Sequence, residues 1–323
     1  MDTLVAWILR AIPFGTIIMY GAMGEIITEK SGNLNLGVPG IMYLGGFAGF
    51  ASAYIYENTA ANPNMALCVV LALVCTFLAS MAGGLIYSFL TISLRANQNV
   101  TGLALTTFGM GVANFFGVYI LNGSTATQSL VYKTFQTKIP VLSRMGVIGQ
   151  TVFGYGFMVY AAIALAIALH IFLNRTRTGL NLRAIGENPA TADADGISVT
   201  RYKYLATCLG AGISGLGGLY YVLDYNQGIW ATTGQIEALG WLAVALVIFA
   251  TWKPLRCIWG AYLFGILSWL YFLIPGLFNG SDKIFQMLPY LFTLIVLITV
   301  SLRRRKEDQP PAGLGIPYFR EER

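Results

Sequence analysis

Long runs without charge constrain this chain more than any other feature. Four of them cover residues 63–94, 96–132, 145–174 and 257–281. Each is longer than the roughly 20 apolar residues that a helix needs to cross the hydrocarbon core of a bilayer. Only 11% of the 323 residues are charged, whereas soluble domains carry about 25%. A transmembrane β-barrel would instead alternate apolar and polar residues in segments of about ten. The sequence therefore predicts an all-α polytopic membrane protein.

The apolar pattern predicts about nine membrane spans, within a range of eight to ten. We place them at residues 4–24, 36–56, 66–93, 99–121, 152–173, 204–223, 238–252, 257–276 and 285–302. Cytoplasmic loops carry an excess of Lys and Arg. With the C-terminus inside, the cytoplasmic segments hold 15 of the 20 Lys and Arg residues, although the external loop at 122–151 also holds three. This distribution predicts an external N-terminus and a cytoplasmic C-terminus.

The expected organisation is one transmembrane domain over residues 1–302, followed by a basic tail over 303–323. The first 25 residues lack a basic start and a small-residue cleavage site, so we interpret them as the first span. The tail begins "RRRKEDQ", which either stops the last helix or contacts anionic lipids. Because membrane topology accounts for the net charge of +6, that charge is no sign of nucleic-acid binding. The four cysteines form no CxxC pair, and we expect neither a disulfide framework nor a metal site.

Small residues recur inside the predicted spans. Gly210, Ser214 and Gly218 follow one another at intervals of four residues, and this spacing lets helix backbones approach closely. The pattern predicts tight helix packing. A functional alternative is that these helices line or gate a path and slide past their neighbours.

The stretch "GEIITEKSGNLNLGVPGIMYLGG", residues 24–46, joins the first two spans. Glu25 and Glu29 lie four residues apart and share a helix face, where Lys30 can neutralise part of their charge. The density of Gly and Pro predicts that the second helix is irregular near its start. Non-helical backbone at membrane depth survives only inside protein or along a water-filled cavity. Either a wall of a channel or substrate site, or an ordinary cytoplasmic turn, would explain the stretch.

A polar island, "RTRTGLNLRAIGENPATADADGIS", fills residues 175–198 of the predicted cytoplasmic loop at 174–203. Asn188 is a favoured helix N-cap, and Pro189 suits the first helical position. Gly196 suits the position just beyond a helix end. The sequence therefore predicts a short Ala-rich helix from Pro189 that ends before Gly196. It is either a docking helix or a capped surface helix without a partner.

Three stretches carry a resemblance to a known family. Residues 24–46, "ANQNVTGLAL" at 96–105 and "LRAIGENPATADADGISVTRYK" at 182–203 resemble the membrane permeases of ABC importers for branched-chain amino acids, simple sugars and nucleosides. The resemblance extends from Gly24 through the last span, and overall likeness is greatest to the nucleoside-importing branch. Simple sugars or branched-chain amino acids remain alternative substrates.

The resemblance implies that the cytoplasmic helix couples the permease to an ATP-hydrolysing subunit. The matching positions are Gly186, Glu187, Asn188, Pro189, Ala192, Asp193 and Gly196. Many family members carry a basic residue where this chain has Asp193, so its ATPase groove is expected to be more basic.

The resemblance also implies a set of partners. They are the ATP-binding subunits, a second homologous permease that makes a heterodimer, and an extracellular substrate-binding lipoprotein. Together they would act in the bacterial plasma membrane. This chain itself would hold no cofactor, because ATP and Mg²⁺ would bind to the partner subunit.

No enzyme motif stands out in the sequence. Residues 28–32, "TEKSG", approach the phosphate-binding P-loop but lack the glycine before the lysine. No HExxH or GxSxG pattern is present, and the only histidine is His170. We therefore predict a transport subunit without catalytic residues. A secondary carrier is the alternative of another class, with Asp224 and Glu237 as candidate ion sites.

A nucleoside path would need a few hydrogen-bonding groups and some ring-sized apolar surfaces. Candidates in or beside the second and fourth spans are Asn35, Gln98, Asn99, Thr107, Phe108 and Asn114. The alternative for each is hydrogen bonding between helices or packing against lipid.

Overall fold

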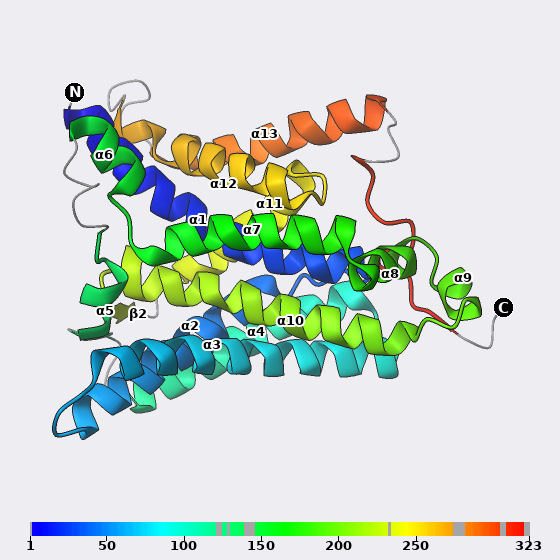
Figure 1. Cartoon of the computed structure of the whole chain (residues 1–323), viewed down its shortest axis with the longest axis horizontal. Helices are drawn as coiled ribbons and strands as arrows, with labels where there is room; N and C mark the ends of the chain where they lie inside the picture. Colours follow the sequence, from blue (N-terminus) through cyan, green and yellow to red (C-terminus); the bar gives the residue numbers. More distant parts are fainter. Residues whose placement is uncertain are drawn as a thin grey trace.

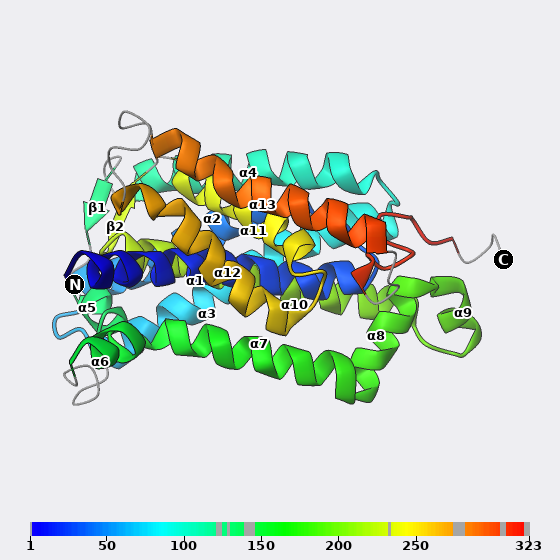
Figure 2. The same ribbon diagram turned by 90° about the horizontal axis from the view of Figure 1, so that it is seen from above.

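The computed structural model is a bundle of long helices with two distinct ends (Figures 1 and 2). It describes residues 2–120, 125–127, 130–138, 146–231, 234–273, 282–303 and 308–319. The first half contains α1 (Asp2–Lys30), α2 (Val38–Thr59), α3 (Met65–Ser88), the π-helix η1 (Phe89–Ser93), α4 (Gln98–Ile120), β1 (Thr125–Thr127), α5 (Leu130–Phe135), α6 (Gly146–Phe153) and α7 (Phe157–Arg175). The second half contains α8 (Arg177–Glu187), α9 (Pro189–Ala194), α10 (Val199–Tyr220), the π-helix η3 (Tyr221–Tyr225), β2 (Ile229–Ala231), α11 (Gln235–Phe249), α12 (Pro254–Ser268), the 3₁₀ turn η4 (Leu270–Phe272) and α13 (Asp282–Arg303).

A helix occupies each of the nine stretches that were predicted to span the membrane. Six of these helices are long and apolar enough to cross a bilayer: residues 3–30, 38–59, 65–93, 98–120, 157–175 and 199–225. The chain is thus a multi-pass membrane protein built from helices. Residues 235–249 and 287–300 form shorter apolar helices. The total of nine spans and the orientation stay predictions.

Helix α10 lies at the centre, packed against α1, α2 and α3. Its small residues bring the backbones together, as their spacing predicted. A Cβ on Gly210 would collide with the carbonyl of Gly24 in α1. The Ser214 hydroxyl donates to the carbonyl of Gly21 over 3.1 Å, and a Cβ on Gly218 would collide with the carbonyl of Met42 in α2. Tight packing is therefore what these small residues provide.

The irregular backbone predicted for the second helix lies before that helix. Residues 31–37 are non-helical and mostly buried, whereas α2 runs without interruption from Val38 to Thr59. Pro39 lies in the first turn of α2, where its missing N–H leaves no hydrogen bond unmade. The expectation of an irregular second helix is thus corrected, because proline in a first turn starts a helix without distorting it.

The two ends of the bundle differ in structure. Strands β1 and β2 pair antiparallel at one end, on the left in Figures 1 and 2, which we call the ribbon end. Helices α8 and α9 and the C-terminal residues lie at the opposite end, which we call the α9 end. Residues 304–306 of the basic run lie outside the described residues, but residues 308–319 are described and fold back onto the α9 end.

The contact between α1 and α10 makes a direct prediction for Gly24→Ala. Its new methyl group would collide with the carbonyl of Gly210 and with the Ser214 hydroxyl. Overpacking of this kind lowers the free energy of unfolding by about 1–3 kcal/mol. We expect the variant to melt at a lower temperature than the native chain when thermal unfolding is followed in detergent.

The matched control is Gly111→Ala in α4, where a Cβ would meet no atom within 4 Å. Alanine is a better helix former than glycine, so this variant should melt at or above the native temperature. Equal melting temperatures for the two variants would contradict the packing described here.

Candidate functional site

The polar loop between α7 and α10 folds into two short helices. The longer one, α8, was not anticipated from sequence, and the Thr176 hydroxyl caps it by accepting from the Gly179 N–H over 3.1 Å. The shorter one, α9, begins at Pro189 as predicted, and the Asn188 side chain accepts from the Thr191 N–H over 3.1 Å.

The end of α9 also follows the sequence prediction. Gly196 has φ +83°, a left-handed conformation that glycine adopts without strain. Its N–H donates to the carbonyl of Asp193, and the N–H of Ile197 donates to that of Ala192, each over 3.0 Å. This pair of bonds is the Schellman motif. The shape of α9 is therefore fixed by local sequence.

Helix α9 presents one face to the protein and another to solvent. Ala192 is buried and packs with Ile185 of α8 and Val199 of α10. The outer surface is small and polar, and its exposed residues are Ala190, Thr191, Ala194, Asp195 and Gly196. Asp193 is half-buried and accepts a hydrogen bond from the Tyr318 hydroxyl over 2.8 Å. Asp195 therefore carries the acidic charge of the outer face.

Gly186 and Glu187 connect α8 to the rest of the molecule. A Cβ on Gly186 would collide with the carbonyl of Lys30 at the end of α1, so the α8 backbone lies directly on α1. The Gly186 carbonyl accepts from the Gly313 N–H over 2.8 Å. The Glu187 carboxylate accepts from the Ala312 N–H over 3.3 Å. Gly186 is thus buried at this junction, whereas Glu187 is exposed and binds the strap backbone from the surface.

Residues 308–319, which we call the strap, tie several elements of the α9 end together. Besides the bonds to α8, the Gly315 N–H donates to the carbonyl of Gly32 over 3.2 Å. The ring of Phe319 lies 4.5 Å from the guanidinium carbon of Arg95, in a cation–π contact. The strap therefore touches the 31–37 segment, α8, α9 and the link between η1 and α4.

Asp308 anchors the start of the strap. Its carboxylate lies 2.8 Å from the ammonium of Lys253 and 2.7 Å from the guanidinium of Arg256. The hydrogen bond from Lys253, together with the bond and charge of Arg256, holds the pKa of Asp308 below its usual value. This carboxylate therefore stays ionised, and its ion pairs persist, down to a lower pH than for an isolated aspartate.

Two glutamates of α1 hold the non-helical segments of the α9 end. The Glu25 carboxylate accepts from the Asn35 N–H over 3.0 Å. The Glu29 carboxylate accepts from the indole N–H of Trp252, in the turn between α11 and α12. Trp252 has φ +56°, a left-handed backbone conformation that residues other than glycine rarely adopt. The hydrogen bond to Glu29 therefore supports this conformation.

Two of the residues predicted to line a substrate path form hydrogen bonds to nearby backbone. The Asn35 side chain accepts from the Gly37 N–H over 2.9 Å, and the Gln98 side chain accepts from the Leu34 N–H over 2.7 Å. Both residues are buried. They fix the segment that leads into α2.

The other path candidates lie along α4. Asn99, Thr107 and Phe108 are exposed on this helix, and Asn114 is half-buried. Within the described residues, the six candidates therefore divide into two buried residues beside the 31–37 segment and four positions along α4. Sequence reasoning also missed Lys203 and Tyr318, because nothing in the tail sequence indicated that it returns to the bundle.

Comparison with known proteins places this architecture in a family. Residues 7–300 match the family model described as "Branched-chain amino acid transport system / permease component". The guanosine ABC transporter permease protein NupQ of Bacillus subtilis is 32% identical over 94% of this chain and 92% of its own length. The nucleoside ABC transporter permease protein NupC of Lactococcus lactis is 29% identical over 99% and 98%. The putative glucose ABC transporter permease protein TsgC13 of Haloferax volcanii is 32% identical over 95% of both chains.

The matched region covers the six long apolar helices except the first turn of α1, and it includes α8, α9 and the 31–37 segment. The chain therefore belongs to the family of permease components of branched-chain amino acid transport systems.

Proposed function

We propose that this chain is a permease subunit of an ATP-driven importer and that its substrate is a nucleoside. The observation that carries the proposal is the similarity, over more than nine-tenths of the chain, to one permease named for guanosine and one named for nucleosides. The ATP-hydrolysing activity is assigned to a separate subunit, which would bind ATP and Mg²⁺.

In this proposal, α9 is the contact with the ATPase subunit. Its outer face offers small side chains that a groove can enclose, and Asp195 supplies one exposed acidic group for a basic groove. Its inner face is fixed to α8 and α10 through Ala192. A force applied to α9 would therefore reach the transmembrane helices directly.

The strap adds a second connection between α9 and the bundle. Tyr318 holds Asp193 of α9, and Gly313 and Gly315 hold Gly186 and Gly32. ATP binding can shift the permease only if it favours one orientation over the other. A firmly attached α9 supports such a shift, because its movement would carry α1 and α10 with it.

The exposed face of α4 is the proposed contribution of this chain to the translocation path. Thr107 and Phe108 are exposed there, and Phe108 retains 53% of its accessible surface. A second, different permease would complete the path, and a binding lipoprotein outside the plasma membrane would deliver the substrate. A flat base could then stack on an aromatic ring of α4.

Glucose is the second candidate substrate, because the Haloferax permease named for glucose matches as well as the one named for guanosine. The deciding experiment reconstitutes the chain with its ATPase, partner permease and binding lipoprotein in proteoliposomes. Uptake of radiolabelled guanosine that depends on ATP and is not reduced by excess glucose or leucine would support the proposal. Uptake of glucose without guanosine would replace it with the sugar assignment.

The docking proposal is tested by Ala194→Arg on the outer face of α9. A bulky cation there should clash with a basic groove, so ATP-driven uptake and co-purification of the ATPase should fall at least tenfold. Ala61→Arg is the matched control, since Ala61 is also exposed but lies in the α2–α3 loop at the ribbon end. If both variants retained the ATPase equally, α9 would not be the contact.

The path proposal is tested by Phe108→Ala. Stacking of a base on an aromatic ring contributes about 1–3 kcal/mol, so guanosine uptake at low substrate concentration should fall by roughly 5- to 150-fold. Phe89→Ala is the control, because Phe89 in η1 is also 53% exposed but lies on another helix. Equal uptake by the two variants would remove Phe108 from the path.

A further inference from the structure

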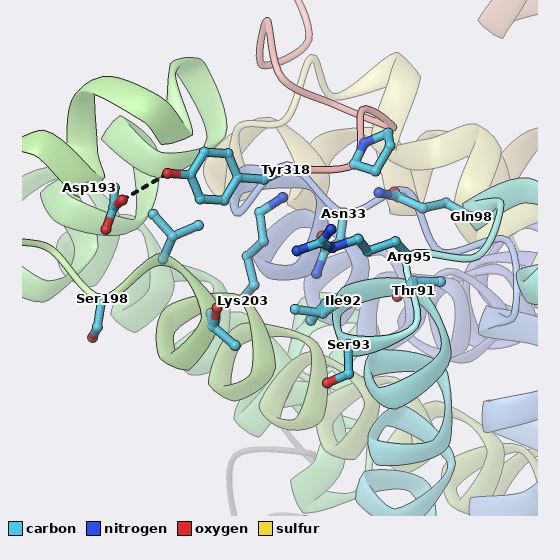
Figure 3. Close-up of a pocket in the computed structure, with 13 residues that line it drawn as sticks. Asn33, Thr91, Ile92, Ser93, Arg95, Gln98, Asp193, Ser198, Lys203 and Tyr318 are labelled. Atoms are coloured by element: carbon cyan, nitrogen blue, oxygen red, sulfur yellow. Dashed lines mark hydrogen bonds between the residues drawn. The ribbon is translucent and has the colours of Figure 1, made fainter. Parts of the chain in front are cut away.

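A polar cavity lies at the α9 end, beneath the strap (Figure 3). Its volume is about 450 Å³, which falls within the range of roughly 300–1,000 Å³ that is typical of small-molecule sites. Its wall is formed by η1 and the η1–α4 link, the start of α10, α9 and the strap. The 31–37 segment contributes Asn33.

Lys203 is the most unusual residue of this wall. Its side chain is 4% exposed and reaches the 31–37 segment, where a Cβ on Gly32 would lie 3.6 Å from its ammonium nitrogen. Within the part of the chain that the structure describes, the ammonium has no hydrogen-bond or ion-pair partner. Burial of a charge without a partner is strongly unfavourable, so this position favours an anion in the cavity.

Arg95 supplies a second cation to the same cavity, and Figure 3 shows both basic side chains pointing into it. Arg95 has φ +57° at the end of η1, where the Ala96 N–H donates to the carbonyl of Leu90 over 2.9 Å. Helix ends of this kind prefer glycine. An arginine in a left-handed conformation is a local strain that persists where the side chain has a function.

The remaining polar groups of the wall indicate which other chemical groups the ligand carries. Asn33 uses its amide N–H to bind the Thr207 hydroxyl over 3.0 Å, but its buried carbonyl oxygen accepts no hydrogen bond. Asp193, the acid that lines the cavity, is engaged by Tyr318. The cavity therefore offers two cations and the unpaired side-chain oxygen of Asn33, which match an anion that also carries a hydroxyl group.

We propose that this cavity binds a small phosphate-bearing anion, with Lys203 and Arg95 holding the phosphate and Asn33 accepting from a neighbouring hydroxyl. The phosphate monoester of a sugar has this chemistry, and so does the headgroup of phosphatidylglycerol. The bound anion would bridge α10, the η1–α4 link and the strap, and would thereby hold α9 against the bundle. This inference does not depend on which solute the permease carries.

The test uses the full chain in nanodiscs of phosphatidylcholine, with ribose 5-phosphate as the probe and ribose as its uncharged control. Ribose 5-phosphate should raise the melting temperature of the native chain, and ribose should not. Lys203→Met should abolish the shift, because methionine keeps the apolar stem without the charge. Arg95→Gln should weaken the binding of ribose 5-phosphate at least tenfold. Because Arg95 is exposed, this variant is expected to fold, and it keeps the test valid if the Lys203 variant does not.

Arg201→Gln is the matched control, since Arg201 lies on the same helix two residues away and does not line this cavity. It should keep the native response. A second set of nanodiscs containing phosphatidylglycerol identifies the source of the phosphate. A Lys203-dependent shift with this lipid, and none with ribose 5-phosphate, would assign the site to the headgroup. The proposal is overturned if neither probe distinguishes the native chain from the Lys203 and Arg95 variants.

Discussion

Seven residues of mostly buried, non-helical backbone at the α9 end set the main constraint on this fold. Away from water, every N–H and C=O of residues 31–37 needs a partner inside the protein. The partners come from helices far apart in the sequence: Glu25 of α1, Tyr87 of α3, and Gln98 and Thr106 of α4. Because these side chains meet at one short segment, they fix how α1, α3 and α4 are arranged around the start of α2.

The same segment is where the α9 end connects to the rest of the bundle. Gly32, Gly186 and Gly313 lie in close contact, with hydrogen bonds from the strap to each of the other two segments. A side chain at Gly186 would push α8 away from α1. The absence of side chains at this junction lets three backbones pack together. Position 186 therefore contributes to attaching α8, whereas the outer face of α9 stays exposed.

Local signals explain which parts of the structure could be predicted from sequence. Asn188, Pro189 and Gly196 each act on neighbouring backbone, so the start and end of α9 were readable without tertiary information. The hydrogen bonds of Asn35 and Gln98 to backbone could not be predicted, because a polar residue near a span looks the same in the sequence whether it binds backbone or substrate. The return of the strap to the bundle could not be predicted for a similar reason. Its contacts join residues between 52 and more than 100 positions apart, and the basic run before it indicated only a helix stop.

The packing of α10 indicates how a movement of α9 would spread. Val199 joins the start of α10 to α9, and the glycines further along α10 lie against the backbones of α1 and α2. Close-packed backbones of this kind cannot slide without breaking contacts along their whole length. Helix α4 follows α2 in the same way, because a Cβ on Gly109 would collide with Gly40. A displacement at α9 would therefore move α1, α2, α4 and α10 as one body. In the proposed function, the change in access would then occur at the surface where α4 faces outward.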